Sequence, residues 1–366
     1  MRRSMTLVDE ILLRVPGNER TMRLGILASL GGTLDAFFPE LIREWQKQGV
    51  EVFGAAGDPS KQVKSDVITG LTRSPRLSNL LAPASLREWI DRHSLDVVLT
   101  NTATASALVR LHKPRVPIVY FCHGLHWKRN DEWSPVWRTV ERYLLGHTTA
   151  AIVSNSEDEA WLNKYLGGGK VARLPFGVGV PIERFVRTPS PPLEGSTRLA
   201  WIGEFSARKR PEIGVEVARY LRDWGVDFRL TMAGEGAMMG RIREEISRHG
   251  LTDRVSLPGR TESGSLITRS HLLLHTSRWE GLARVLLEAA AIGRNSYGFE
   301  VKGVRDLASV ATVQDGDARA LATLIRDDIE KGLPAQPYPP PEDMTSAHHA
   351  DIVLSNLRAW LAEPAS

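Results

Sequence analysis

Cysteines, long apolar runs and a signal-like start are largely missing from this sequence. Its 366 residues include a single cysteine, Cys122, so no internal disulfide can form and a reducing compartment is allowed. No apolar run reaches the roughly 18 residues that a membrane-spanning helix needs. Asp9 and Glu10 interrupt the start before an apolar core can form, which argues against a secretory signal. We therefore expect the chain to act in the cytoplasm.

A large charge of one sign is also lacking, because 47 Lys and Arg stand against 43 Asp and Glu. The small basic excess lies in the first half: residues 1–185 hold 24 basic and 19 acidic side chains, whereas residues 186–366 hold 23 and 24. A basic first half suits an anionic partner, such as lipid headgroups on the inner face of the cytoplasmic membrane, but is more often an ordinary solvated face. No basic run is interleaved with aromatic residues, so nucleic acid is not an expected partner.

The length and the order of apolar segments indicate two α/β domains in tandem. A chain of 366 residues is too long for one ordinary core. A buried-strand pattern at 22–28, an amphipathic helix and a second strand at 50–55 form a β-α-β unit, and similar units follow. Residues 186–197 are rich in Pro and show no period, which is typical of a linker. A strand at 199–202 restarts the alternation, which predicts two doubly wound domains.

The same patterns set the expected domain boundaries. These are a leader at 1–20, a first domain at 21–185, the linker at 186–197, a second domain at 198–345 and a C-terminal helix at 346–366. The last helix has apolar residues available for burial: Ile352, Leu354, Leu357 and Trp360. A further amphipathic helix is predicted at 133–146, with Val136, Trp137, Val140, Tyr143 and Leu144 on one face.

The stretch 276–293 holds the motif around which the rest of the chain is organised. An apolar run at 272–274 leads into a polar loop that ends in Glu280 and Gly281, and an apolar segment of good helix formers then runs to Gly293. This order predicts strand, loop and helix. In a parallel sheet such a loop lies at the carboxyl end of a strand, where ligands bind.

The start of this helix is a candidate anion site. The free N–H groups there, which include those of Leu282, Ala283 and Val285, suit a phosphate. Glu280 and Glu288 bracket the helix start with seven residues between them. The alternative is a surface loop followed by an amphipathic helix with one solvated glutamate.

Two motifs in the first half follow predicted strands. Gly31 and Gly32 come after the first strand, where glycines let the backbone approach a ligand closely or simply form a tight turn. His123 and Gly124 follow a buried strand at 116–122, so the imidazole is placed to reach into a crevice. Near its reference pKa a histidine serves as donor or base, although a structural role is equally open.

Four other motifs resemble ligand sites only superficially. Residues 167–170 (Gly-Gly-Gly-Lys) lack the spacing of a P-loop and are better explained as a turn. The glycines of 234–240 have one residue too many for the dinucleotide fingerprint. The acidic pair in 315–317 indicates a turn into a helix rather than a metal site, and the adjacent histidines at 348–349 are a poor chelating pair that we expect to be solvated.

Taken together and in order, the motifs resemble the family 4 glycosyltransferases of the GT-B fold, over residues 22–329. The features that carry the likeness are Gly31-Gly32, His123-Gly124, the loop 203–209, Glu280-Gly281 and Glu288. A narrower similarity points to the bacterial branch that adds N-acetylhexosamines to polyprenyl-diphosphate-linked saccharides, in capsule, exopolysaccharide or N-glycan assembly. It rests on residues 123–127, 140–142, 155–158, 177–180 and 303–306.

The resemblance implies an architecture and an activity. In the GT-B fold two Rossmann-like domains face each other across a cleft, and the C-terminal helix crosses back to the first domain. The implied activity is that of a retaining hexosyltransferase, which moves a sugar from a nucleotide donor to a saccharide acceptor. N-acetylhexosamine and UDP are the best guesses for sugar and nucleotide, and the acceptor is either lipid-linked or soluble. No cofactor and no metal are expected.

The resemblance also assigns the donor diphosphate to particular residues. A cation is needed where the leaving group gains charge. Lys209 would supply it, together with Arg208 or Arg210 and the helix start at 282–285. Gly31 and Gly32 would let the backbone of the first domain close over the phosphates.

The remaining roles implied by the resemblance concern the sugar, the ribose and the base. Glu280 would bind the donor sugar, and Glu288 would hold the ribose hydroxyls. His123 would meet a sugar hydroxyl or the acceptor, and the loop with Arg260 would contact the base. Glu280, His123 and Lys209 are thus the expected catalytic residues.

Some positions depart from the family pattern. Glu204 stands where an arginine is frequent, Asn295 where a proline is usual, and Trp279 where an arginine often occurs. Three other functions therefore stay open: a non-catalytic partner in a glycan assembly complex, a nucleotide-sugar 2-epimerase, and, as the weakest alternative, an NAD-dependent oxidoreductase.

Overall fold

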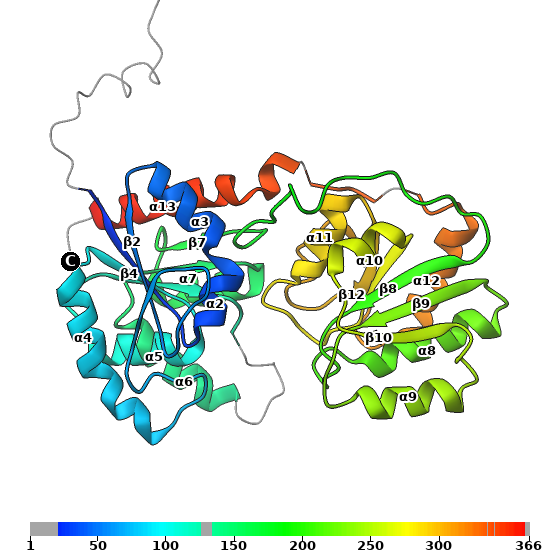
Figure 1. Ribbon diagram of the computed structural model, residues 1–366, viewed down its shortest axis with the longest axis horizontal. Helices are drawn as coiled ribbons and strands as arrows, with labels where there is room; N and C mark the ends of the chain where they lie inside the picture. The colour runs from blue at the N-terminus through cyan, green and yellow to red at the C-terminus, as the bar shows by residue number, and fades with distance from the viewer. Residues whose placement is uncertain (1–20, 126–133, 335, 340, 363–366) are drawn as a thin grey trace, which may run out of the picture.

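The computed structural model describes residues 21–125, 134–334, 336–339 and 341–362. They form two α/β domains side by side, with a seven-stranded sheet in the first and a six-stranded sheet in the second (Figure 1). All strand pairings in both sheets are parallel. The two predicted doubly wound domains are thereby confirmed, and in each sheet all strands present their carboxyl ends at one edge.

The first sheet has the strand order β3-β2-β1-β4-β5-β6-β7. Its strands are β1 (Arg23–Leu27), β2 (Glu51–Ala56), β3 (Ser65–Val67), β4 (Val97–Thr100), β5 (Ile118–Cys122), β6 (Ala150–Val153) and β7 (Val171–Arg173). Its helices are α2 (Gly31–Phe37), α3 (Pro39–Lys47), η1 (Leu77–Leu81), α4 (Ala82–His93), α5 (Ala103–His112), α6 (Ser134–Leu145) and α7 (Ser156–Leu166). Strands β4, β5 and β6 are buried at every residue, which explains their unbroken apolar sequences.

The second sheet has the order β10-β9-β8-β11-β12-β13. Its strands are β8 (Thr197–Ile202), β9 (Phe228–Ala233), β10 (Val255–Gly259), β11 (Leu272–His275), β12 (Asn295–Phe299) and β13 (Val310–Val313). The helices are α8 (Pro211–Asp223), α9 (Met239–Arg248), α10 (Ser263–Arg269), α11 (Arg284–Ile292) and α12 (Ala318–Glu330), followed by η2 (Pro341–Met344) and α13 (Ser346–Ala362). Asp317 caps α12 by accepting a hydrogen bond from the Ala320 N–H, so the acidic pair at 315–317 does lead into a helix.

The C-terminal helix α13 lies against the first domain, as the resemblance implied (Figure 1). It packs on α3, where the Trp45 indole Nε1 donates to the Ala350 carbonyl at 2.9 Å. Leu354 and Leu357 are buried in the same core as Trp45. The helix therefore ties the end of the chain to the domain in which the chain began.

One expectation about this helix is wrong. His349 is buried, with Nδ1 2.9 Å from the Thr345 carbonyl oxygen and its ring edge against Phe176, whereas its neighbour His348 is exposed. Adjacent residues of a helix point about 100° apart, so one of the pair faces the core and the other faces solvent.

The Pro-rich segment that was predicted as a linker is held against the second domain. Arg294 is buried, and its guanidinium donates hydrogen bonds to the carbonyl oxygens of Thr188 and Pro189. The Thr188 N–H donates to the Ile292 carbonyl at 3.1 Å. The chain passes between the two domains twice, after Val180 and again near Met344. These two segments lie side by side, because the Val180 N–H donates to the Met344 carbonyl at 2.8 Å. The second domain thus begins to hold the chain before β8.

Helix α6 has the predicted amphipathic pattern, but most of its apolar face is not covered by the described residues. Val136, Trp137, Val140 and Tyr143 are between 42% and 57% exposed, and the buried side chains are those of Leu144 and Leu145 at its end. A buried ion pair between Glu141 and Arg110 fixes the helix to α5. The ion pair therefore holds the helix in a position in which these four apolar side chains are exposed.

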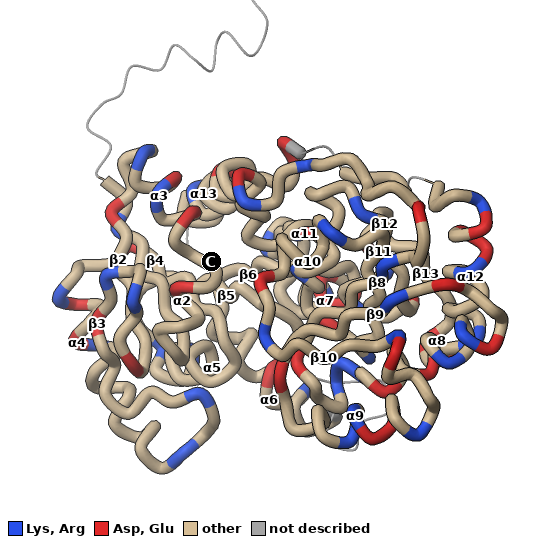
Figure 2. The backbone as a smooth tube through the Cα atoms, turned by 45° about the vertical axis from the view of Figure 1, so that its right-hand side comes forward, with Lys and Arg blue, Asp and Glu red and all other residues tan. Residues whose placement is uncertain are grey.

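Charges of both signs alternate over the second domain. Figure 2 shows Lys and Arg interspersed with Asp and Glu along α9 and α12. This is the pattern of a solvated face. Among the helices of the described residues, none has the length and hydropathy of a membrane-spanning segment.

We predict that Trp45→Ala lowers the free energy of unfolding by roughly 3–5 kcal/mol, because it removes a fully buried indole that joins α3 to α13. The matched control is Trp137→Ala, in the same domain but 51% exposed, which should change it by less than about 0.5 kcal/mol. Urea unfolding followed by circular dichroism measures both. Equal losses in the two variants would contradict this description of the core.

Candidate active site

A cavity of about 340 Å³ lies where the two domains meet. The first domain lines it with Phe37, His123 and Ser154, and the second with Arg208, Glu280 and Arg284, among others. His123 follows β5 and Glu280 follows β11, so the cavity lies at the carboxyl ends of strands from both sheets. The structure therefore brings together Glu280 and His123, which are 157 positions apart in the sequence.

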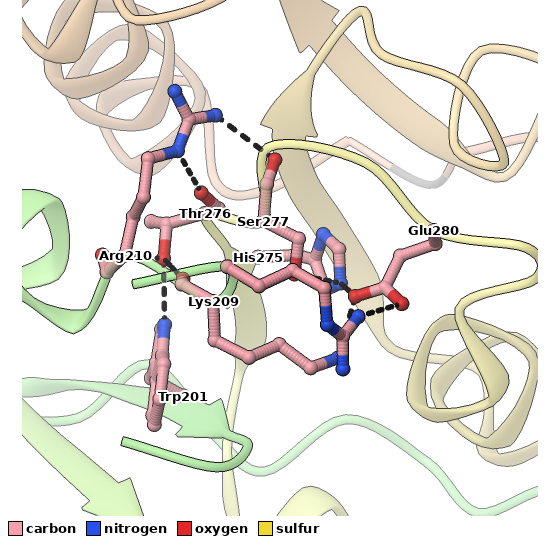
Figure 3. Close-up of polar contacts among 8 residues, drawn as sticks. Trp201, Lys209, Arg210, His275, Thr276, Ser277 and Glu280 are labelled. Carbon is pink, nitrogen blue, oxygen red and sulfur yellow. Dashed lines mark hydrogen bonds and ion pairs between the residues drawn. The ribbon is translucent and has the colours of Figure 1, made fainter. Parts of the chain in front are cut away.

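Glu280 is the centre of a charge cluster at this cavity (Figure 3). Its side chain is 7% exposed. One carboxylate oxygen lies 2.5 Å from the Lys209 Nζ, and the other lies 2.5 Å from the Arg208 Nη1. His275 Nε2 is 3.6 Å from the carboxylate. Burial alone raises the pKa of Glu280, but the neighbouring His275, Lys209 and Arg208 together hold it well below its usual range, so the carboxylate is charged at neutral pH.

The loop that carries Arg208 and Lys209 is held in place by side-chain hydrogen bonds (Figure 3). Thr276 Oγ1 accepts from Trp201 Nε1 at 2.8 Å and donates to the Lys209 carbonyl at 2.7 Å. Arg210 is buried and donates to the carbonyl oxygens of Thr276 and Ser277. The sequence left Arg208 and Arg210 open as partners of Lys209. The structure places Arg208 beside Lys209 at the carboxylate, and Arg210 supports the backbone.

His123 is held between two aromatic rings. Its imidazole stacks on Phe37 at 5.0 Å and on Phe121 at 4.6 Å between ring centroids. Burial, with a smaller contribution from the Arg284 charge, lowers the pKa of His123 to about 4. Its Nε2 is inaccessible to solvent and has no hydrogen-bond partner within the described part of the chain. A neutral imidazole with a free ring nitrogen can bind one hydroxyl or N–H group of a ligand.

The backbones of the two domains touch directly beside the cavity. A Cβ atom on Gly281 would lie 1.4 Å from the His123 carbonyl oxygen, and one on Gly124 would lie 2.6 Å from the Gly281 Cα. Both positions therefore require glycine. This contact places the His123 loop against the Glu280 loop.

The candidate anion site at the helix start lies partly at the cavity. Leu282 lines it, and α11 begins at Arg284, so Ala283 is the capping residue and Val285 lies in the first turn. The helix thus starts two residues later than predicted. The N–H groups of Leu282 and Ala283 belong to the strand-to-helix loop, and that of Val285 belongs to the first turn of the helix.

Glu288 lies in α11, and its side chain is not among those that line the cavity. Burial raises the pKa of this carboxyl, while a hydrogen bond with Ser263 and the charge of Arg284 oppose that rise. Ser263 opens α10 just after Arg260, so Glu288 faces the segment that the resemblance assigns to the base. The Arg260 side chain itself is 86% exposed, 4.0 Å from Glu235.

Gly31 and Gly32 also lie outside the cavity lining. Gly31 opens α2, donates its N–H to Asp58 Oδ1 at 2.8 Å, and packs so that a Cβ would lie 2.4 Å from the Pro59 carbonyl oxygen. Gly32 faces open space. Gly31 therefore has a packing reason of its own, and a ligand-binding role stays a prediction for both.

Arg284 is a cavity residue that was not predicted from the sequence. Its Nη1 donates to the Ala36 carbonyl at 2.8 Å, and its guanidinium carbon lies 5.1 Å from the centre of the Phe37 ring, so this second-domain residue reaches the first domain at the cavity wall. The signal was present, because Arg284 interrupts the apolar segment at the helix start. It was not used because the segment was judged by its helix period alone.

Two family models match nearly the whole span of both sheets. The model described as "Glycosyltransferase Family 4" matches residues 37–180, and the one described as "Glycosyl transferases group 1" matches residues 184–334. The chain belongs to the GT-B glycosyltransferases. The cavity of this glycosyltransferase lies between the parts that the two models match.

Individual relatives agree with this membership. EpsD of Bacillus subtilis (strain 168), which is described as a glycosyltransferase, is 25% identical over 338 residues, covering 85% of this chain and 88% of that protein. WcaL of Escherichia coli (strain K12), described as a colanic acid biosynthesis glycosyltransferase, is 28% identical over 40% of this chain and 39% of its own. The structure of HepE from Anabaena, in complex with UDP and glucose, superposes with a TM-score of 0.69 at 17% identity, covering 91% of this chain and 95% of HepE.

The low pKa of His123 predicts a pH effect on stability. The unfolded imidazole takes up a proton near pH 6.5, whereas the folded one does so near pH 4, so stability is full above pH 6.5 and falls as the pH drops towards 4. His123→Phe, which keeps a ring between Phe37 and Phe121, should lose about 1–2 kcal/mol less than the wild type between pH 7 and pH 5.

Urea unfolding at the two pH values measures this difference. The control is His348→Phe at an exposed position, which should keep the wild-type pH dependence. If His123→Phe also keeps it, the imidazole is not the buried neutral group described here.

Proposed function

We propose that this glycosyltransferase moves a hexose, namely an N-acetylhexosamine, from a UDP-sugar to a saccharide acceptor with retention of the anomeric configuration. The observation that carries the proposal is the pairing of Glu280 with Arg208 and Lys209, in which Arg208 and Glu280 line the interdomain cavity together with His123 and Lys209 lies behind Glu280. A nucleotide sugar carries a diphosphate, which cations bind, and a hexose, whose hydroxyl groups need hydrogen-bond acceptors and donors. The cluster supplies both kinds of group at one place.

The cations suit the leaving group. As the bond from the sugar to the diphosphate breaks, negative charge grows on the phosphate oxygens, and fixed positive groups lower the barrier most when little water is present. Lys209 and Arg208 are already held by Glu280 and by the loop beneath them. Glu204, at the position where the family often has arginine, is exposed, and Arg208 takes the place of the missing cation.

The acid–base groups favour retention. Glu280 is the one carboxylate that lines the cavity among the described residues, and its low pKa makes it a weak base. Inversion needs a strong base opposite the leaving group, whereas in retention a phosphate oxygen of the departing diphosphate takes the proton of the attacking hydroxyl. The new bond then forms on the face from which the diphosphate leaves. Glu280 would instead accept hydrogen bonds from the donor sugar.

The acceptor is proposed to be a saccharide of cell-surface polysaccharide assembly, linked to polyprenyl diphosphate. WcaL acts in colanic acid biosynthesis by its description, which supports a polysaccharide acceptor. The exposed apolar face of α6, with exposed Arg138 and Arg142 on the same helix, supports peripheral contact of the first domain with an anionic membrane. A chain that works at the inner face of the cytoplasmic membrane would meet a lipid-linked acceptor there. The HepE complex with UDP and glucose supports UDP as the donor nucleotide.

The test is release of nucleoside diphosphate from a panel of UDP-, GDP- and TDP-sugars, with and without a short polyprenyl-diphosphate-linked saccharide. We expect acceptor-dependent release from one UDP-sugar, and a product whose anomeric coupling constant by NMR matches that of the donor. Donor binding without release would indicate a non-catalytic partner. Release without an acceptor, with formation of the 2-epimeric sugar, would indicate an epimerase.

We predict that Lys209→Met lowers kcat/KM by roughly 10²–10³-fold, because a fixed positive charge at the leaving group is lost. The matched control is Lys331→Met, which removes a lysine that is 66% exposed in the second domain and should leave kcat/KM unchanged. Both are measured by steady-state release of UDP. A loss of less than about threefold in Lys209→Met would overturn the assignment of this lysine.

A further inference from the structure

A buried ion pair joins the two domains behind the cavity. Lys302 lies in the loop after β12, and 7% of its surface is exposed. Its Nζ is 2.5 Å from Asp158 Oδ1 in α7 and donates to the Leu125 carbonyl at 2.8 Å. Both partners belong to the first domain. A buried ammonium group needs such partners, so Lys302 is stabilised only while the first domain is in contact.

The backbone of the same loop supports Glu280. The Lys302 carbonyl oxygen accepts a hydrogen bond from the Glu280 N–H at 2.9 Å. Gly303, at φ +74°, packs so closely that a Cβ there would lie 2.4 Å from the Glu280 carbonyl oxygen. The residue that holds the first domain through its side chain therefore also holds Glu280 through its backbone.

The first domain holds the other side of the Glu280 loop. Asn155 Nδ2 donates to Asp158 Oδ2 at 2.8 Å and to the Gly281 carbonyl at 3.1 Å. Asn155 Oδ1 accepts from the Asp158 N–H, which fixes the amide at the start of α7. The contacts thus run from Lys302 through Asp158 and Asn155 back to the residue after Glu280.

A second contact strengthens this junction. Asp306 of the second domain accepts from the Ser156 N–H at 3.0 Å and from the Ser156 Oγ at 2.6 Å. Ser156 opens α7, so the Asp306 carboxylate also meets the positive end of that helix. A carboxylate from one domain therefore completes the helix start of the other.

We propose that Asn155, Ser156, Asp158, Lys302 and Asp306 form an interdomain latch, and that Lys302 is the residue through which closure of the latch positions Glu280. None of these five residues lines the cavity. When it is closed, the N–H of Glu280 and the carbonyl of Gly281 are both held. When it is open, the Gly281 carbonyl loses its partner and the Lys302 loop loses its anchor on the first domain. The donor site is then complete only in the closed arrangement of the domains.

The test compares the wild type with Lys302→Met and with the double variant Lys302→Met/Asp158→Leu. The single variant leaves Asp158 buried without its cation, which by itself can impair folding. The double variant removes both charges, so no buried charge is left unpaired, but it also removes the acceptor of the Leu125 N–H, which donates to Asp158 Oδ2 at 3.1 Å. Lys331→Met again controls for the loss of a lysine.

The first readout uses the donor-free protein and needs no turnover. We expect faster amide hydrogen exchange, by roughly tenfold or more, in the segment 279–283 of both latch variants, together with a larger radius of gyration by X-ray scattering. Segments in the cores of the two sheets should exchange as in the wild type. Unchanged exchange at 279–283 and an unchanged radius in the double variant would overturn the latch.

The second readout is kinetic and rests on the proposed function. Because donor binding must now close the domains without help, the KM for the donor should rise by roughly tenfold or more, while kcat at saturating donor falls less. A merely structural role would lower kcat in proportion to the folded fraction and leave KM unchanged, which would also contradict the positioning role. If the wild type transfers no sugar at all, the proposed function fails, and the exchange and scattering results still decide the latch.

Discussion

The contact between Gly281 and the His123–Gly124 peptide is the constraint on which the rest of the site depends. A Cβ at Gly281 would lie 1.4 Å from the His123 carbonyl oxygen, so the two loops meet backbone to backbone. Each loop follows the carboxyl end of a strand, β5 in one sheet and β11 in the other. Because the contact belongs to neither domain alone, the cavity has its full shape only while the two domains are together.

The charges at this contact explain how the site can be both stable and ready to bind an anion. Arg208 and Lys209 share one carboxylate, that of Glu280, and Arg284 adds a further positive charge at the cavity wall. Buried charges must be paired, and Glu280 provides the pairing when no ligand is bound. The cavity keeps an excess of positive charge, which a diphosphate would neutralise. Glu280 would then be released from part of its ion pairing and turn to the hydroxyls of a sugar.

Much of the fold followed from the sequence, because apolar strands between amphipathic helices leave few alternatives to two parallel sheets. The motifs at Glu280, Lys209 and His123 could be found because each follows a predicted strand. The latch could not, since Asp158 lies in the motif 155–158 but nothing in the sequence pairs it with Lys302, 144 positions away. The burial of His349 and the exposure of the apolar face of α6 could not be predicted either. Periodicity shows that a helix has an apolar face, but it does not show which part of the fold covers that face.

The central claim is that Arg208 and Lys209 are the diphosphate site and that Glu280 occupies them in the free protein. Calorimetric titration of UDP into the wild type, Glu280→Gln and Lys209→Met tests it most directly. We predict that Glu280→Gln binds UDP at least as tightly as the wild type, because the competing carboxylate charge is gone, and that Lys209→Met binds it roughly tenfold more weakly. Equal affinity in all three proteins, or weaker binding in Glu280→Gln alone, would show that Glu280 does not occupy a diphosphate site formed by Arg208 and Lys209.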